Sequence, residues 1–383
     1  MLYFDNHATT HVDPEIFDIF QNIECDLRIG NPHSSEHENG WNADNIINQS
    51  LEIFSNLLNC ICSELIFTSG ATEANNLAII GLSTKAYLNK LDKNKIIISA
   101  IEHASVRNSA YQVSKLFGFE IIEIPITKEG VINLDILKES IDGKTLLVTC
   151  MAVNNEIGTI QPIKEISKIC RKYNTIFHVD AAQAGYLLLE EIVPYVDSLS
   201  LSGHKIYAPK GIGLLYINKY SPLTPEPIIH GGNQQNGMRS GTLSPALCLS
   251  FAKAYEKLCR IKELEINKLR SHSEYFYNLL AEKGIKFKIH GNTINRHPGN
   301  LNFSIEGIDA RLLIMRLQPR VAISTGSACY SGQIESSHVL KALDLSSEEI
   351  LSTLRIGLGR FNTSEQIFEL VEILCEEVQK IMN

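Results

Sequence analysis

The stretch Ser198-Leu199-Ser200-Leu201-Ser202-Gly203-His204-Lys205 ends a run of strand character in a glycine, a histidine and a lysine. A second run of strand character, residues 175–179, ends in Asp180. The aspartate and the lysine are about 25 residues apart, which is room for one strand, one connection and a second strand. This spacing predicts that Asp180 and Lys205 follow neighbouring strands of one sheet.

An aspartate and a lysine at neighbouring strand ends suit pyridoxal 5'-phosphate. The aldehyde of this cofactor forms a Schiff base with a lysine amine, which Lys205 can supply. Its ring nitrogen stays protonated, so that the ring accepts electrons, when a carboxylate such as Asp180 lies beside it. Taken singly, such an aspartate is more often a turn or helix cap, and a loop lysine is more often solvated. The interpretation depends on the two residues together with the rest of the chain.

Strand-like and helical segments alternate along residues 64–217. Such alternation predicts a mostly parallel α/β sheet covered by helices on both faces. We expect strands at 64–67, 95–99, 119–124, 146–151, 176–179, 198–201 and 213–217, and helices at 74–88, 104–117, 134–141 and 163–173. Ligands of such sheets bind beyond the carboxyl ends of the strands. The candidate residues all follow apolar runs: Thr72, His103, Asn155, Asp180 and Lys205.

A turn of small residues, Thr68-Ser69-Gly70-Ala71-Thr72-Glu73, joins the first of these strands to the first of these helices. Free backbone N–H groups and the positive end of the helix dipole make such a turn an anion site. A phosphate group is expected there, although an ordinary strand–helix turn can have the same composition.

The composition is that of a globular protein, with 44% hydrophobic and 20% charged residues. A net charge of −8 and the lack of a basic run argue against direct binding of nucleic acid. No apolar stretch is long enough to span a bilayer, and the first residues do not form a secretory signal. The nine cysteines are scattered and odd in number, so we expect a cytoplasmic protein without a metal site.

The length of 383 residues exceeds one ordinary core, so we expect two domains. Residues 14–252 would form a large cofactor-binding domain. Residues 1–13 and 253–383 would form a smaller α+β domain that carries the loop around Cys329. Its expected elements are helices at 246–283, 310–317, 337–343 and 364–382, and strands at 286–290 and 300–305.

An ordered set of short motifs identifies a family. The motifs run over nearly the whole chain: residues 4–10, 30–32, 67–73, 102–103, 153–158, 178–180, 202–205, 237–242, 324–329 and 354–355. This set is similar to that of the NifS/IscS-type cysteine desulfurases, which are fold-type I pyridoxal-phosphate enzymes of the class-V aminotransferase group. The resemblance implies a mostly parallel sheet of seven strands and a smaller domain.

The resemblance implies a role for each matching residue. Lys205 forms the Schiff base and moves protons, Asp180 pairs with the ring nitrogen, and His103 stacks on the ring and acts as an acid or base. The remaining cofactor contacts would come from Asn155 and Gln183 near the ring hydroxyl, and from Ala71, Thr72, Ser202, His204 and a partner subunit's Thr242 at the phosphate. The substrate carboxylate would be held by Asn31, Asn155 and Arg355.

The implied activity removes sulfur from L-cysteine and leaves L-alanine. Cys329 takes the sulfur as a persulfide and passes it to an acceptor protein, in iron–sulfur cluster assembly, tRNA thiolation or DNA phosphorothioation. The Gly- and Ser-rich surroundings of Cys329 suit an exposed loop. The implied oligomer is a homodimer whose active sites are completed across the two-fold axis.

Three departures from the family pattern lie in loops. Residues 233–235 lack the usual His-Glu, Tyr330 replaces a threonine, and residues 37–40 lack a basic residue. We expect these changes to affect the choice of acceptor more than the chemistry. The alternatives are a selenocysteine lyase or another class-V enzyme, and a scaffold without activity; the joint presence of Lys205, Asp180 and Cys329 argues against the scaffold.

Overall fold

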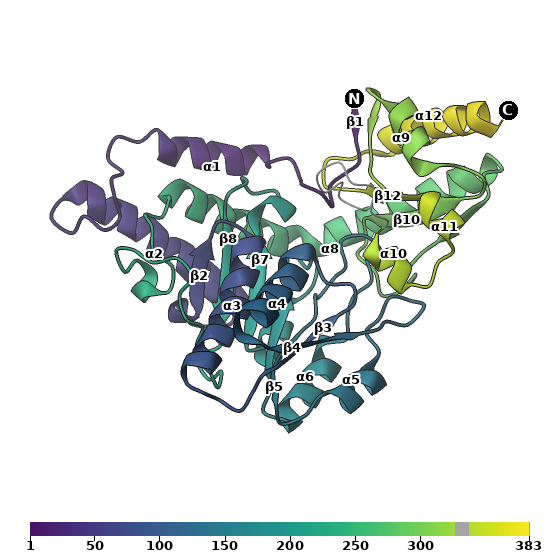
Figure 1. Cartoon of the computed structure of the whole chain (residues 1–383). Coiled ribbons are helices and arrows are strands. Elements are labelled where there is room, and N and C mark those ends of the chain that lie inside the picture. The colour runs from purple at the N-terminus through teal and green to yellow at the C-terminus, as the bar shows by residue number, and fades with distance from the viewer. Residues whose placement is uncertain (326–336, 383) are drawn as a thin grey trace.

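The computed structural model describes residues 1–325 and 337–382, so Cys329 lies outside the described residues. Its strands form one large and one small sheet and a two-stranded pair (Figure 1). The strands are β1 (Leu2–Tyr3), β2 (Leu65–Thr68), β3 (Lys95–Ser99), β4 (Glu120–Ile124), β5 (Thr145–Thr149), β6 (Ile176–Asp180), β7 (Ser198–Ser202), β8 (Gly213–Ile217), β9 (Phe287–Ile289), β10 (Asn300–Ile305), β11 (Val321–Ala322) and β12 (Thr353–Gly357).

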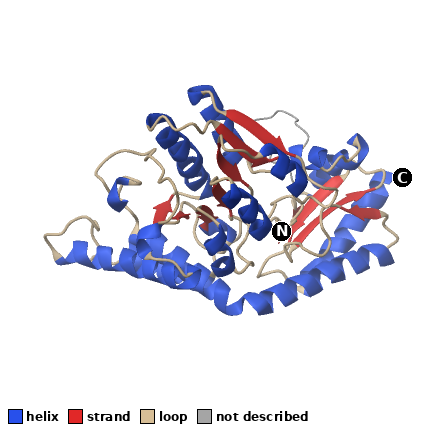
Figure 2. Ribbon diagram, turned by 90° about the horizontal axis from the view of Figure 1, so that it is seen from below, coloured by secondary structure: helices blue, strands red, loops and turns tan. Residues whose placement is uncertain are grey.

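The helices pack against these sheets, as Figure 2 shows for both groups of strands. They are α1 (Pro14–Glu24), α2 (Glu38–Leu58), α3 (Ala71–Leu88), α4 (Ala104–Phe117), α5 (Leu134–Ser140), α6 (Ile163–Lys172), α7 (Leu189–Ile192), α8 (Pro245–Glu282), α9 (Ala310–Leu317), α10 (His338–Ala342), α11 (Ser347–Leu351) and α12 (Ser364–Met382). Short 3-10 turns are η1 (Cys62–Glu64), η2 (Val193–Tyr195), η3 (Gly203–Lys205) and η4 (Gln235–Gly237).

The large sheet has seven strands in the order β2-β8-β7-β6-β5-β3-β4. The strands from β7 to β4 pair in parallel, whereas β8 runs antiparallel to both β2 and β7. The prediction of a mostly parallel seven-stranded sheet is therefore confirmed. Parallel strands end at the same edge, and this brings the residues that follow β6 and β7 together.

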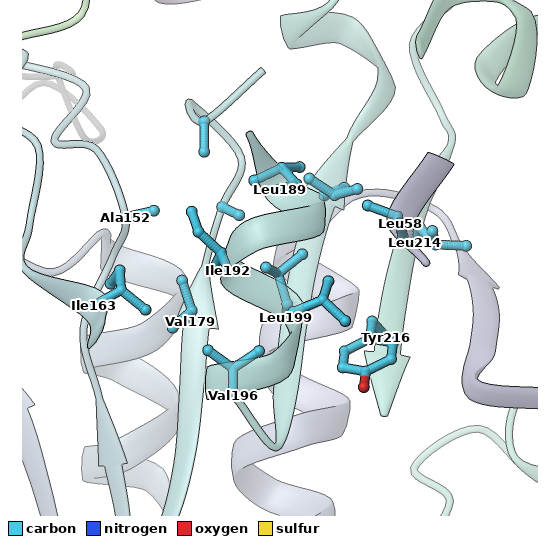
Figure 3. Packing of buried hydrophobic residues seen from close by; sticks show 14 of the residues in the cluster. Leu58, Ala152, Ile163, Val179, Leu189, Ile192, Val196, Leu199, Leu214 and Tyr216 are labelled. Carbon is cyan, nitrogen blue, oxygen red and sulfur yellow. The ribbon is translucent and has the colours of Figure 1, made fainter. Parts of the chain in front are cut away.

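Side chains alternate between the two faces of this sheet. Phe177 and Val179 of β6 join a core with α2, α6, α7 and α8, while Ile176 packs on the other face with α3 and α4. Figure 3 shows Ile192 of α7 close to Val179 and to Leu199 of β7. Full burial of one such side chain stabilises the fold by about 1.5–3 kcal/mol. On β7 the leucines face this core, so the serines between them face α3.

The small sheet, in the order β12-β10-β9, is antiparallel and has its own core. Leu269 and Phe276 in the second half of α8 pack there with β10, β12, α9 and α12. Phe4 from the N-terminal segment is buried in the same core, because β1 pairs with β11. The expected domain boundaries stay a prediction, and α8 runs across the second of them. No helix within 1–325 or 337–382 is long and apolar enough to span a membrane.

Most of the predicted elements are present, and some have the predicted bounds. The strands at 95–99, 213–217 and 300–305 and the helices at 104–117, 310–317 and 364–382 are found as expected. The helix expected from residue 74 begins three residues earlier, at Ala71, because its first turn is formed by the Gly-Ala-Thr turn itself. Helix α2 was not predicted, since its buried face mixes apolar residues with small polar ones such as Ser50 and Ser55.

Candidate active site

Lys205 lies in η3, directly after β7 at the carboxyl edge of the sheet. Its amine donates to the backbone oxygens of His7, over 2.5 Å, and Ala8, over 2.9 Å. Burial, and then the charge of Arg355, lowers the pKa of Lys205 to about 8. A lysine with this pKa is neutral far more often than an ordinary one, and the neutral amine is the nucleophile and the base.

Asp180 is the last residue of β6 and its side chain is buried. One carboxylate oxygen accepts from Asn75 Nδ2 over 2.7 Å, and the other accepts from the backbone N–H of Ala182 over 2.9 Å. A carboxylate oxygen has two lone pairs. Each oxygen therefore has acceptor capacity beyond these described bonds, at the edge where Lys205 also lies.

His103 is the N-cap residue of α4, so backbone geometry fixes its ring. Its Nδ1 accepts from the backbone N–H of Ser105 over 3.1 Å and lies 2.8 Å from the Ser105 hydroxyl. Because Nδ1 is an acceptor, the neutral ring carries its proton on Nε2. Burial lowers the pKa of His103, so the neutral form prevails at pH 7.

The turn before α3 has the geometry of an anion site. The N-cap is Gly70, and no described side chain caps the helix, so the N–H groups of Ala71 and Thr72 are available to a ligand. A side chain at Gly213 would lie 2.5 Å from the Gly70 Cα, so this close approach of β8 requires glycine. The Ser202 hydroxyl also lies beside Gly70.

A pocket of about 260 Å³ lies between the N-terminal halves of α3 and α4. Thr72 and His103 line it from the two helices, and Ser105 lies in its wall. The predicted phosphate turn and the predicted ring-stacking histidine therefore border one cavity.

Gln183 and His204 hold the N-terminal segment against this edge. The amide of Gln183 donates to the His7 backbone oxygen over 2.8 Å, the same oxygen that Lys205 contacts. The Nδ1 atom of His204 lies 3.1 Å from the Thr9 hydroxyl oxygen. Both predicted cofactor ligands thus lie next to Lys205.

Arg355 lies on β12, in the small sheet, and its side chain is 7% exposed. It donates to the Asp5 carboxylate over 2.9 Å and to the Asn155 backbone oxygen over 3.2 Å. Its buried Nε–H has no partner among the described residues. The structure thus brings together Arg355 and Asn155, two residues predicted to hold the substrate carboxylate.

The segment that contains Cys329 starts and ends near Arg355. Ser324 exchanges two backbone hydrogen bonds with Arg355, of 2.7 and 3.2 Å. At the other end, the Ser337 hydroxyl donates to Glu156 over 2.6 Å. Glu156 directly follows Asn155, so both ends of this segment are fixed beside the predicted substrate site.

Two predicted residues do not join this group within one chain. Asn31 is exposed in the connection between α1 and α2, which Figure 1 shows at the opposite end of the molecule from β12. Thr242 is exposed in the loop before α8. The predicted contact of Asn31 with the substrate carboxylate, and that of Thr242 with the phosphate of a partner subunit's site, stay predictions.

The loop that departs from the family pattern is fixed to the edge strand β2. The Gln235 amide accepts from the Phe67 backbone N–H over 2.7 Å and donates to the Phe67 oxygen over 2.9 Å, as a neighbouring strand would. Arg239 pairs with Glu73 over 2.7 Å, and Glu73 accepts from the Ser69 N–H over 2.8 Å. The loop that ends in Thr242 is thereby attached to the turn that is predicted to bind the phosphate.

Two residues of the site were not predicted. Asp5, which pairs with Arg355, was only part of a matching segment. Asn75, which contacts Asp180, is a fully buried polar residue in α3. Its sequence signal is an asparagine among helix neighbours that are apolar, such as Ala78 and Ile79.

Known proteins share this fold over its full length. A family model described as "Aminotransferase class-V" matches residues 2–370. Cysteine desulfurase IscS of Rickettsia typhi is 40% identical over 99% of this chain and 92% of its own length. A solved NifS-like protein has a TM-score of 0.89 at 30% identity, covering 99% of each chain. The structure "SspA in complex with cysteine" has a TM-score of 0.79 at 31% identity, covering 95% of this chain and 100% of the other.

The fold and the residues at its sheet edge define a class-V aminotransferase, and the chain belongs to that family. Within the family it belongs to the cysteine desulfurases of the IscS and NifS type.

Proposed function

We propose that this protein is a cysteine desulfurase that takes sulfur from L-cysteine, releases L-alanine and holds the sulfur as a persulfide on Cys329. One observation carries the proposal: the Lys205 amine, with its pKa lowered to about 8, lies at the same sheet edge as the buried Asp180 carboxylate. The kinship with IscS of Rickettsia typhi supports the activity. A structural neighbour solved with cysteine supports the substrate.

The residues at this edge fit pyridoxal phosphate, on which this family depends. The acceptor capacity left on Asp180 suits a ring N–H. The uncapped start of α3 suits a phosphate, which Ala71, Thr72, Ser202 and His204 would hold. When bound, the cofactor supplies an electron sink for the electrons released at the substrate Cα.

Lys205 is the base in this proposal. With a pKa of about 8, roughly one amine in ten is neutral at pH 7, against about one in 2,500 for a lysine of pKa ~10.4. The neutral amine takes the Cα proton and later returns a proton to the substrate. His103 accepts at Nδ1, so its proton is on Nε2, and that N–H would be the donor toward the cofactor or the substrate.

Arg355 and Asn155 orient the substrate. A guanidinium matches a carboxylate with two parallel hydrogen bonds, and the Nε–H of Arg355 has no described partner. The substrate carboxylate would take this position and turn the Cβ–S bond toward the segment whose ends are fixed at Ser324 and Ser337. Asn31 of a second copy would complete the carboxylate site, and Gln183 would contact the ring hydroxyl.

The sulfur moves from Cβ of the substrate to Cys329. The Cys329 thiolate attacks the substrate sulfur, an S–S bond forms and the Cβ–S bond breaks. The bonding electrons stay with Cβ, which takes up one proton, equal to the one that Cys329 lost on ionising, and becomes the methyl group of alanine. An acceptor protein then takes the sulfur from Cys329, in iron–sulfur cluster assembly, tRNA thiolation or DNA phosphorothioation.

Two further proposals concern the state of the protein. We infer a homodimer, because Asn31 and Thr242 are exposed in loops and bond to no other predicted site residue among residues 1–325 and 337–382 of one chain. We infer a reducing compartment such as the cytoplasm, because the eight described cysteines are all free thiols.

The test compares the wild type with Cys329→Ser. The wild type loaded with pyridoxal phosphate should release alanine from cysteine, and mass spectrometry should find the extra sulfur on Cys329. The variant should still bind the cofactor and cysteine but form no persulfide. Undiminished release of alanine by the variant would contradict the role of Cys329 and favour the selenocysteine-lyase alternative.

A further inference from the structure

Asn75 on α3 is fully buried and connects the two residues that are proposed to flank the cofactor ring. Its Nδ2 donates to Asp180 over 2.7 Å and to the Ser105 hydroxyl over 2.9 Å. Its Oδ1 accepts from His178 Nε2 over 3.0 Å and from the Ser200 hydroxyl over 2.6 Å. All four hydrogen-bonding positions of the amide are therefore used.

The chemistry of these partners allows one orientation of the amide. A carboxylate accepts hydrogen bonds, so Nδ2 faces Asp180 and Oδ1 faces His178. Burial lowers the pKa of His178 to about 4, so its ring is neutral at pH 7. Its single N–H points to Asn75, and its Nδ1 accepts from the Ser198 hydroxyl over 2.8 Å. Hydrogen bonds thus run in one direction, from Ser198 through His178 and Asn75 to Asp180.

The second arm of the network reaches His103. The Ser105 hydroxyl oxygen accepts from Asn75, so its own proton is available to His103 Nδ1, 2.8 Å away. The Ser105 backbone N–H points to the same nitrogen. Both donors hold His103 in the form with its proton on Nε2.

The strand register explains why these groups meet. His178 and Asp180 share one face of β6, because side chains two apart in a strand point the same way. In the parallel pair with β7 they lie opposite Ser198 and Ser200. The resulting polar patch faces α3, and Asn75 is the α3 side chain that bonds to it.

We propose that Asn75 is a positioning residue that holds Asp180 and His103 in the orientation and protonation state that the cofactor ring requires. The inference rests on the proposed function, because it assigns Asn75 a role toward the cofactor. Asn75 acts through its two partners and does not itself touch the substrate.

The test measures cofactor binding and not turnover. Apoprotein variants are titrated with pyridoxal phosphate, and the visible band of the bound cofactor is then followed against pH. Asn75→Ala should weaken binding about tenfold, which corresponds to ~1.4 kcal/mol. It should also move the midpoint of the band to higher pH by about half a unit or more. When the ring nitrogen loses its proton, a positive charge near Lys205 disappears. The Lys205 nitrogen that is bonded to the cofactor then becomes more basic, so the band changes at a higher pH.

Ser83→Ala is the matched control. Ser83 is also a fully buried polar residue of α3, but its hydroxyl donates to the Ile79 backbone oxygen. This variant should change neither the affinity nor the midpoint. If Asn75→Ala behaves like Ser83→Ala in both measurements, the positioning role is wrong.

Two further variants keep the test decisive. If far-UV circular dichroism shows that Asn75→Ala does not fold, Asn75→Asp replaces it. That variant sets a second carboxyl group against Asp180, and the pair then shares a proton; an unchanged midpoint would again overturn the inference. Asp180→Asn is measured in parallel. If it alters neither quantity, the proposed function fails; if it alters both and Asn75 variants alter neither, only the role of Asn75 fails.

Discussion

The guanidinium of Arg355 donates to the carboxylate of Asp5 over 2.9 Å. Arg355 comes from the small sheet and Asp5 from the N-terminal segment, 350 residues earlier in the chain. The arginine is nearly buried, whereas the aspartate is 22% exposed. This ion pair orients the guanidinium, and the Nε–H of Arg355 has no partner among residues 1–325 and 337–382, which is why we propose it as a donor to the substrate carboxylate.

Replacing Arg355 should weaken cysteine binding. Arg355→Lys keeps the positive charge but loses the planar, two-point match to a carboxylate. A hydrogen bond to a charged group contributes about 1.5–3 kcal/mol, so the KM for cysteine should rise by roughly ten- to a hundredfold. Steady-state assays of alanine release measure this. Asp5→Asn is the comparison, because it retains an acceptor for Arg355 and should raise KM much less. An unchanged KM in Arg355→Lys would rule out the assignment.

Capture of pyridoxal phosphate by the apoprotein should depend on the pH with a midpoint near 8. The pKa of Lys205 is lowered to about 8, mainly by burial, and the neutral amine is the reactive form. The rate of covalent capture, trapped with borohydride and located by peptide mapping, should therefore rise between pH 7 and 9. Lys205→Ala should capture none, whereas alanine in place of Lys210, which is exposed, should have no effect. A midpoint near that of a free lysine would contradict the prediction.

Glu102 should make the apoprotein less stable as the pH rises. Burial, and then the charge of Asp180, raises the pKa of Glu102 to about 8 in the folded state. Between the unfolded pKa, ~4.3, and about 8, the folded state binds more protons than the unfolded state. Its contribution to the free energy of unfolding is therefore present at pH 4 and is lost as the pH approaches 8.

Glu102→Gln removes this titration and retains an oxygen that can accept from the Met151 N–H, as Glu102 does over 2.7 Å. Urea unfolding of the apoproteins is measured at pH 5, 6.5 and 8. The free energy of unfolding of the variant, relative to that of the wild type, should rise with pH by up to a few kcal/mol, at ~1.4 kcal/mol per pKa unit. Glu156→Gln serves as comparison, because burial raises the pKa of Glu156 only to about 7. If the free energies of unfolding of wild type and Glu102→Gln change with pH in parallel, the Glu102 carboxyl group of the folded protein is ionised over this whole pH range, and the prediction is wrong.

Thr242 should act in the active site of the partner. Thr242→Ala and Lys205→Ala are each expected to bind the cofactor poorly, because each lacks one part of every site. After the two variants are mixed and exchange subunits, about a quarter of the sites combine an intact Lys205 with an intact Thr242. Tight cofactor binding and alanine release should return to that extent. The same mixture without subunit exchange is the control, and no recovery after exchange would place Thr242 outside the site.

Local sequence pattern was enough for much of the fold. Segments with strong apolar runs or clear helical periodicity lie where they were predicted. Residues 95–99 are an apolar run that is buried on both faces of the sheet, and residues 104–117 bury one face of a helix. Helix α2 was missed, because its buried face includes Ser50 and Ser55, whose burial depends on the helices packed over them.

Sequence alone determined the family and the chemical types at the site, because the order of the motifs and the identities of Lys205, Asp180 and Arg355 are written in the chain. The tertiary structure decided how these groups are oriented and charged. The lowered pKa of Lys205 arises from burial and from Arg355, a residue of another sheet. The Asn75 network joins two helices and two strands. Hydrogen bonds and desolvation depend on distances in space, and positions along a chain do not specify those distances.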